Sequence, residues 1–269
     1  MKKKVLSLCL VMALAATAVV GGTLAYFTDT DEETNTFTAG GVEISLIEKQ
    51  VNEDGTALED FEQDQVLMPI VGSAQGEKDM FGQPIAENYV DKIVTVENTG
   101  KSDAYVRAYF AIPSALDDGY ETFNAGRNVL HFNFGNEDGA STYGNQWNWK
   151  HGDKWNYYET TIDGAAYNVY FADYYRVLPA GEATEQFISG VYLDKSFDQN
   201  TIDKVTKYYA FGQEINLSGL TDDNGNLSIK CPVKAVAVQA AGFDDVDAAV
   251  TEAFGANYNP FGGEPSNWQ

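Results

Sequence analysis

The sequence predicts an all-β protein, an antiparallel jelly-roll-like β-sandwich with one or two short helices. Apolar and polar residues alternate along several stretches, for example from Val106 to Ile112, as they do in half-buried strands. Turn pairs that suit hairpins, such as Asp54-Gly55 and Asp163-Gly164, separate these stretches. The 25 glycines, 16 tyrosines and 15 phenylalanines, set against 4 methionines and 2 cysteines, favour strands and turns over a helical bundle.

Length and charge narrow the possible functions. The chain has 269 residues, 44% of them hydrophobic, which is enough for one large β-domain. It carries 17 Lys and Arg against 40 Asp and Glu, a formal net charge of −23. Because phosphate backbones and anionic lipids are repelled at this charge, nucleic acids and membrane surfaces are not expected as partners.

Residues 1–25 have the parts of a secretory signal peptide. Three lysines are followed by an uncharged apolar stretch over residues 5–20, and Thr23 with Ala25 provides the small residues that signal peptidases prefer. We therefore expect export, with cleavage between Ala25 and Tyr26. The apolar stretch is shorter than the ~20 residues of a spanning helix, so the mature chain should not be stably inserted in a membrane. Loss of the three lysines would take the net charge from −23 to −26.

The mature chain should contain strands throughout and one clear helix. The helix is expected over Phe243–Phe254, where apolar residues recur at helical spacing after three aspartates and before Gly255. A second helix is expected over Thr201–Phe211. The expected strands are Val42–Leu46, Lys92–Asn98, Val106–Ile112, Tyr167–Val177, Thr184–Leu193 and Leu227–Gln239.

Residues 26–255 should form a single sandwich domain. We interpret residues 117–158, which are rich in glycine and aromatic residues, as an insertion in it. Residues 256–269 show no periodicity and should form a flexible tail. Cys231 alternates in register with Ile229 and Val233, which indicates a buried thiol, with a disulfide between two chains as the alternative.

Patterns that carry catalysis are sparse, so we predict no catalytic residue and no cofactor. The two histidines, His131 and His151, are twenty positions apart and form no His-Glu-x-x-His pair. No Gly-x-Ser-x-Gly sequence identifies a nucleophilic serine. A zinc site built from both histidines and a distant carboxylate stays open as an alternative.

Two other ligand classes have candidate residues. Asp222, Asn224 and Asn226 alternate oxygen-bearing side chains as a calcium loop does, but the later glutamate is missing, and a hairpin turn explains the same residues. Tryptophans in the predicted insertion could stack on sugars, whereas packing in the core is the competing interpretation. These tryptophans are Trp147, Trp149 and Trp155.

The predicted cleavage site carries a family resemblance. The stretch Gly21-Gly22-Thr23-Leu24-Ala25-Tyr26-Phe27-Thr28-Asp29-Thr30-Asp31, with residues 34–40 and 42–46 after it, resembles the junction of the TasA/camelysin family. These are secreted Gram-positive proteins whose signal peptides are cut by a SipW-type signal peptidase. Shorter likenesses follow in family order at residues 96–100, 103–107, 178–182 and 236–240.

The resemblance implies a jelly-roll subunit of extracellular biofilm-matrix fibres, with other copies of the chain as partners. In such fibres the segment after the cleavage site completes a sheet of the next subunit. Here that leading segment is residues 26–38, whose β-forming residues suit strand addition; alternatively, it forms the first strand of its own sandwich. The donor residues are Tyr26, Phe27, Thr36, Phe37 and Thr38.

Two further functions stay open. Camelysins are also described as metallopeptidases, so a secreted zinc metalloendopeptidase is the alternative that the resemblance implies, although the sequence has no recognisable zinc motif. A cell-surface adhesin that binds glycans through the tryptophans is the third possibility.

Overall fold

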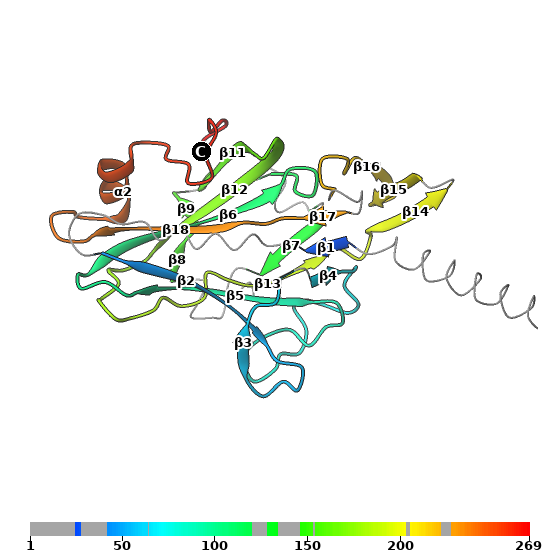
Figure 1. Cartoon of the computed structure of the whole chain (residues 1–269), viewed down its shortest axis with the longest axis horizontal. Coiled ribbons are helices and arrows are strands. Elements are labelled where there is room, and N and C mark those ends of the chain that lie inside the picture. Colours follow the sequence, from blue (N-terminus) through cyan, green and yellow to red (C-terminus); the bar gives the residue numbers. More distant parts are fainter. Residues whose placement is uncertain are drawn as a thin grey trace, which may run out of the picture.

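The computed structural model describes residues 25–27, 42–63, 65–119, 128–133, 146–152, 154–202, 205–221 and 227–269, and it confirms the all-β class (Figure 1). One helix, α2 (Val246–Phe254), accompanies the strands in this part of the chain. The strands are β1 (Ala25–Phe27), β2 (Ile44–Val51), β3 (Leu58–Asp60), β4 (Gln65–Leu67), β5 (Val90–Asn98), β6 (Ala104–Pro113), β7 (Leu130–Asn133), β8 (Trp147–Asn148), β9 (Lys150–His151), β10 (Lys154–Trp155), β11 (Tyr157–Ile162), β12 (Ala165–Tyr174), β13 (Ile188–Leu193), β14 (Asp198–Ile202), β15 (Val205–Ala210), β16 (Gln213–Ile215), β17 (Ser228–Ile229) and β18 (Val233–Gln239).

Two antiparallel sheets form the sandwich. One has the strand order β3-β2-β5-β13-β7, and the other has the order β11-β12-β6-β18 with β8 beside β12. From β5 to β18 the chain passes repeatedly from one sheet to the other, as in a jelly roll. Side chains of both sheets meet in one core, to which β5 contributes Val94 and Val96, and β6 contributes Val106 and Phe110. The predicted sandwich is therefore confirmed.

Strand β6 is buried on both faces, which explains why it is almost wholly apolar. Val106, Ala108 and Phe110 face the core between the sheets, while Tyr109 and Ala111 belong to a second apolar cluster on the outer face. Helix α2 contributes to the second cluster, so the sandwich carries a third layer on this side (Figure 1).

The predicted helix over Phe243–Phe254 is confirmed, with its first helical residue at Val246. The Asp245 side chain caps it by accepting a hydrogen bond of 2.8 Å from the Ala248 backbone N–H. Gly255, with φ of 92°, follows the last turn and donates its N–H to Thr251. Val246, Ala249 and Val250 are buried against the sheet.

Residues 256–269, predicted from the sequence to form a flexible tail, contact the outer face of the sheet. Trp268 stacks on Tyr158, with ring centroids 4.5 Å apart and planes at 7°. Backbone hydrogen bonds of 2.8 Å join Ser266 and Glu159 in both directions. Because isolated aromatic side chains make these contacts from a loop, they leave no periodic pattern in the sequence.

One further prediction is corrected: the described part of residues 201–211 forms no helix. Strands β14 and β15 pair there, with Thr201 opposite Thr206; alternation and β-branched residues favour such a hairpin as much as the apolar spacing favours a helix. Within the predicted insertion of residues 117–158, β7 pairs with β13 at the edge of a main sheet. Cys231 is buried, as its register predicts.

Three smaller sheets accompany the sandwich in the described part of the chain, with the orders β14-β15-β16, β17-β1-β4 and β10-β9. Figure 1 shows β14–β16 at one end of the long axis and α2 toward the other, with β1 on the β14 side. Within the described part of the chain, no helix has the length and apolar character needed to cross a membrane.

Candidate functional site

The predicted cleavage junction forms the central strand of a small sheet. Strand β1 pairs antiparallel with β4, where Tyr26 lies opposite Val66, and parallel with β17, where Tyr26 lies opposite Ser228. Both edges of this backbone segment are therefore occupied. We call the position between β4 and β17 the strand slot.

The strand slot is defined by its two neighbours, which come from distant parts of the chain. Leu67 of β4 and Ile229 of β17 are buried in the core, so both walls of the slot are anchored in the sandwich. Strand pairing uses backbone groups and depends little on side chains, so any extended segment could in principle occupy the slot. Of the predicted donor residues, Tyr26 and Phe27 lie in it within their own chain, whereas Thr36, Phe37 and Thr38 are outside the described residues.

The two histidines lie on different sheets. His131 is on β7, where its ring stacks on Tyr192 at a centroid distance of 4.9 Å and its Nε2 lies 3.4 Å from Asp194 Oδ2. Burial lowers the pKa of the His131 imidazole, an effect that the Asp194 carboxylate opposes. His151 is exposed on β9.

These positions bear on the zinc and calcium alternatives. Among the residues that the structure describes, no three His, Cys, Asp or Glu side chains are grouped closely enough to hold a metal ion. The predicted calcium ligands Asp222, Asn224 and Asn226 are outside the described residues.

The tryptophans do not form the exposed platform that a glycan-binding surface would need. Trp147 and Trp149 are only 2% and 8% exposed, and both pack on Phe187, at centroid distances of 5.0 and 4.6 Å. Trp155 is half-buried and meets the edge of Tyr170. The tryptophans therefore serve the core, which corrects the adhesin hypothesis in the form that the sequence suggested.

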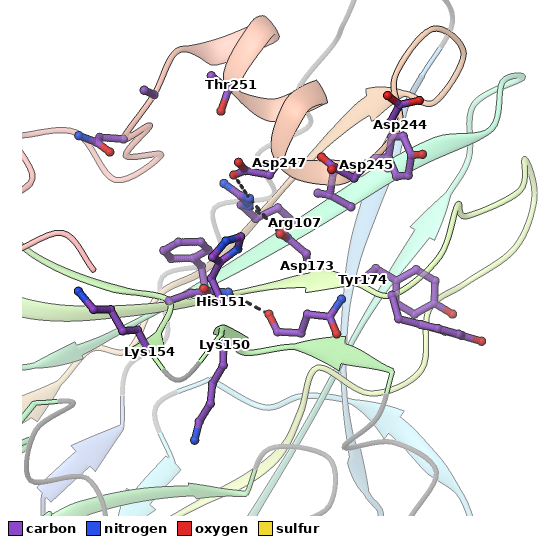
Figure 2. Close-up of a pocket in the computed structure, with 18 of the residues that line it drawn as sticks. Arg107, Lys150, His151, Lys154, Asp173, Tyr174, Asp244, Asp245, Asp247 and Thr251 are labelled. Carbon is purple, nitrogen blue, oxygen red and sulfur yellow. Dashed lines mark hydrogen bonds and ion pairs between the residues drawn. The ribbon is translucent and has the colours of Figure 1, made fainter.

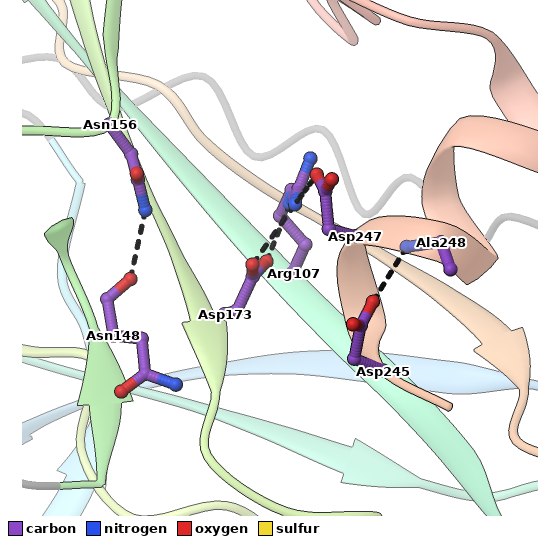
Figure 3. Close-up of polar contacts among 7 residues, drawn as sticks. All are labelled: Arg107, Asn148, Asn156, Asp173, Asp245, Asp247 and Ala248. Atoms are coloured by element: carbon purple, nitrogen blue, oxygen red, sulfur yellow. Dashed lines mark hydrogen bonds and ion pairs between the residues drawn. The ribbon is translucent and has the colours of Figure 1, made fainter. Parts of the chain in front are cut away.

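A buried arginine joins three elements at one side of the sandwich (Figure 3). Arg107 lies on β6 directly opposite Asp173 on β12, and its Nε and Nη2 donate to the two Asp173 oxygens at 2.5 and 3.0 Å. Nη2 also donates to Asp247 Oδ1 of α2 at 3.0 Å. The guanidinium group lies 4.9 Å from the centroid of the Phe171 ring. Arg107 thus ties α2 to the sheet that it covers.

The shared charges shift the ionisation of this cluster. Burial acts to lower the pKa of Arg107, but the hydrogen bonds and the charge of Asp173 outweigh it and raise that pKa. Burial raises the pKa of the Asp173 carboxyl, although the Arg107 guanidinium opposes the rise.

Arg107 and Asp173 also line a cleft of about 690 Å³, which we call the polar cleft (Figure 2). One wall is the β9–β10 hairpin, with Lys150, His151 and Lys154, and the facing wall is the start of α2, with Asp244, Asp245 and Asp247. Phe171, Tyr175 and Trp268 add aromatic surface.

Sequence reasoning missed the polar cleft because strands β6, β8, β9, β10 and β12, helix α2 and the residues after it together build it. A single signal was available: Arg107 is the one charged residue in the otherwise apolar stretch Val106–Ile112. A charge that is predicted to lie in a buried strand requires a partner, but the sequence does not say which of the 40 acids provides it.

Comparison with known families supports the resemblance of the junction. Residues 1–54 match the family described as camelysin metallo-endopeptidase. The predicted resemblance to the TasA/camelysin family is confirmed for this N-terminal part. The match covers the junction, β1 and β2, whereas the polar cleft lies outside it. Comparisons with curated proteins and with solved structures found no match.

Proposed function

We propose that the chain is a secreted structural protein that assembles into extracellular matrix fibres by strand addition. The observation that carries the proposal is the position of β1. The segment next to the predicted cleavage site fills the strand slot and belongs to neither main sheet. The same segment of another copy could occupy the slot with the same backbone pairing. The camelysin-family junction supports export, because proteins of this family are in general extracellular or surface-associated.

In this proposal each subunit exchanges its own strand for that of a neighbour. Among the described residues, 25–27 pair in the slot, and cleavage after Ala25 leaves Tyr26 and Phe27 of these in the mature chain, so a small number of backbone hydrogen bonds between described residues opposes their release. A neighbouring copy restores the same bonds, and repetition of this step in one direction gives an open fibre.

A disulfide experiment tests the exchange directly. Tyr26 lies opposite Val66 in an antiparallel pair, and such partners have Cα atoms ~4.5–5.5 Å apart, within the range of a disulfide. A mature Tyr26→Cys chain and a mature Val66→Cys chain are mixed, assembled and oxidised. Strand addition predicts a disulfide-linked dimer of the two variants. Cys231 is buried and should not compete.

Two controls make the result specific. Leu58→Cys is the matched control, since Leu58 is 42% exposed, close to the 38% of Val66, but lies on β3 away from the slot. A mature chain that lacks residues 26–38 should not form filaments in electron micrographs. Filaments without this segment, or equal cross-linking to both cysteines, would refute strand addition.

The charge of the chain predicts how assembly responds to solution conditions. A net charge near −26 makes subunits repel one another, and protons or divalent cations reduce that repulsion. We expect a higher filament yield by sedimentation at pH 5 than at pH 8, and recovery at pH 8 on addition of millimolar Ca²⁺. A yield that ignores both changes would contradict this mechanism.

A secreted metalloendopeptidase is the second candidate, because the matching family is described as one. Its test is hydrolysis of casein by the purified mature chain and by a double variant, His131→Ala with His151→Ala. Activity that persists through purification and disappears in the double variant would favour the peptidase.

A further inference from the structure

The two faces of the strand slot differ in burial. Residues directly opposite one another in a ladder share a face of the sheet, and successive residues of a strand alternate between the faces. On β4, Leu67 is 1% exposed and the neighbouring Val66 is 38% exposed. On β17, Ile229 is 0% exposed, whereas Ser228 is half-buried. One face of the small sheet therefore lies on the core, and the other lies outward.

The register assigns each position of the occupying strand to one of these faces. Position 26 pairs with Val66 and with Ser228, so it lies on the outward face. Position 27 pairs with Ile229, so it lies on the core face. A slip of one residue in the slot would exchange the two faces, so the burial of the walls favours a single register.

The core face of the slot is apolar. Leu67, Leu227 and Ile229 all belong to the core between the main sheets. Gln65, the second partner of position 27, donates from its Nε2 to Gln50 Oε1 at 2.6 Å, so its amide is engaged with another side chain. An apolar residue at position 27 extends this core, whereas a polar residue there is taken from water into apolar surroundings at a cost in free energy.

The leading segment supplies an apolar residue at this position. Cleavage after Ala25 would leave position 27 as the first core-face position of the occupying strand, and the residue there is Phe27. Residues 28–36 contain no apolar residue, and Phe37 is the next one along the chain. Backbone pairing alone distinguishes poorly between extended segments, so selection between them depends on the side chains that the walls accept.

We propose that the strand slot selects its occupant at position 27, where it accepts Phe27 of a second copy on the core face and tolerates many residues at position 26. The inference rests on the proposed strand addition and names the residue that determines its specificity. Position 26 lies beside Val66 and Ser228 on the outward face, so it contributes chiefly through its backbone.

Competition by synthetic peptides tests this selection without changing the fold of the chain. The mature Tyr26→Cys and Val66→Cys chains are mixed and oxidised in the presence of a peptide with the sequence of residues 26–38. This parent peptide should fill the slot and lower the yield of the linked dimer. A Tyr26→Ser peptide should reach half inhibition at a similar concentration, whereas a Phe27→Ser peptide should need at least about tenfold more. A Phe27→Leu peptide keeps an apolar residue and should fall between the Phe27→Ser peptide and the parent.

The outcomes separate this inference from the proposed function. A scrambled peptide has the same composition and charge as the parent and is the control, which should not inhibit. A parent peptide that leaves the yield unchanged would refute strand addition by this segment, and the selection with it. Equal inhibition by the Tyr26→Ser and Phe27→Ser peptides would overturn the selection at position 27 but leave strand addition standing.

Discussion

At the scale of single residues, the two carboxylates bound to Arg107 should contribute unequally to stability. The Asp173 side chain is 17% exposed and takes two hydrogen bonds from Arg107, whereas Asp247 is 67% exposed and takes one. Asp173→Asn should lower the free energy of unfolding by about 3 kcal/mol, because it leaves a buried cation poorly compensated. Asp247→Asn should cost less than about 1 kcal/mol. Urea denaturation measures both, and equal losses would show that burial does not set the difference.

Another residue-scale prediction concerns Asp91 on β5. Burial, reinforced by the charge of Asp79, raises the pKa of this carboxyl to about 7, against an opposing hydrogen bond from Val51. The folded chain therefore holds a proton that the unfolded chain has lost between pH of about 4 and 7. Because folding binds a proton in this window, the free energy of unfolding falls as pH rises through it, by up to about 1.4 kcal/mol per pH unit.

Asp91→Asn should remove this dependence, since the amide is neutral at every pH. The variant should have a higher melting temperature than the parent chain at pH 8 and a similar one at pH 4.5. Glu252→Gln, which removes an exposed carboxylate from α2, is the control and should leave the difference between the two pH values unchanged. The same dependence of melting temperature on pH in the parent chain and in Asp91→Asn would contradict the assigned role of Asp91.

At the scale of elements, the sequence predicts a helix or strand best when the contacts that stabilise it are local and its pattern fits one kind of element. Helix α2 has its cap, its acidic start and its terminal glycine within a few residues, so the sequence alone identified it. The hairpin of β14 and β15 was missed although its pairing is local, because helical spacing and strand alternation compete in residues 201–211. The contacts of residues 256–269 with Tyr158 and Glu159 join residues far apart in the chain, so no local pattern indicates them. The residues of the candidate sites differ in the same way. Tyr26 belongs to a continuous sequence motif, so the sequence identifies it. Arg107 pairs with Asp173 and Asp247, which are 66 and 140 positions away, so no local pattern indicates these pairs.

The tail gives a prediction about one of these distant contacts. Trp268 stacks on Tyr158 and also lies 5.4 Å from the Phe171 ring, so it covers the outer face of the sheet. Trp268→Ala should lower the free energy of unfolding by about 2 kcal/mol and speed proteolysis of residues 256–269. Glu264→Ala, at an exposed position of the same tail, should change neither. A stable, resistant Trp268→Ala chain would mean that the backbone bonds of Ser266 suffice.

At the scale of the whole molecule, the strand slot and the polar cleft lie apart. β1 lies on the side of β14–β16, and α2 with the polar cleft lies toward the other end of the long axis (Figure 1). The strand slot is built from β1, β4 and β17, whereas the polar cleft is lined from β6, β12, the β9–β10 hairpin and α2, so the two features use different elements of the chain.

The strand slot also predicts the order of export and folding. The bond between Ala25 and Tyr26 lies inside β1, paired with β4 on one edge and with β17 on the other from Tyr26 onward. Proteases bind substrates as extended segments with exposed edges, so the folded precursor should resist cleavage here, and the signal peptidase should act before the slot closes. Chymotrypsin tests this, because it cuts after Tyr26 and Phe27 and, as an internal reference, after Phe211, which is 41% exposed in the turn before β16. Mass spectrometry of the full-length precursor should show cleavage at β1 at least about tenfold slower than at Phe211 in buffer, and comparable at both sites in 6 M urea. Equal rates in buffer would mean that β1 does not protect the cleavage site, and processing could then follow folding.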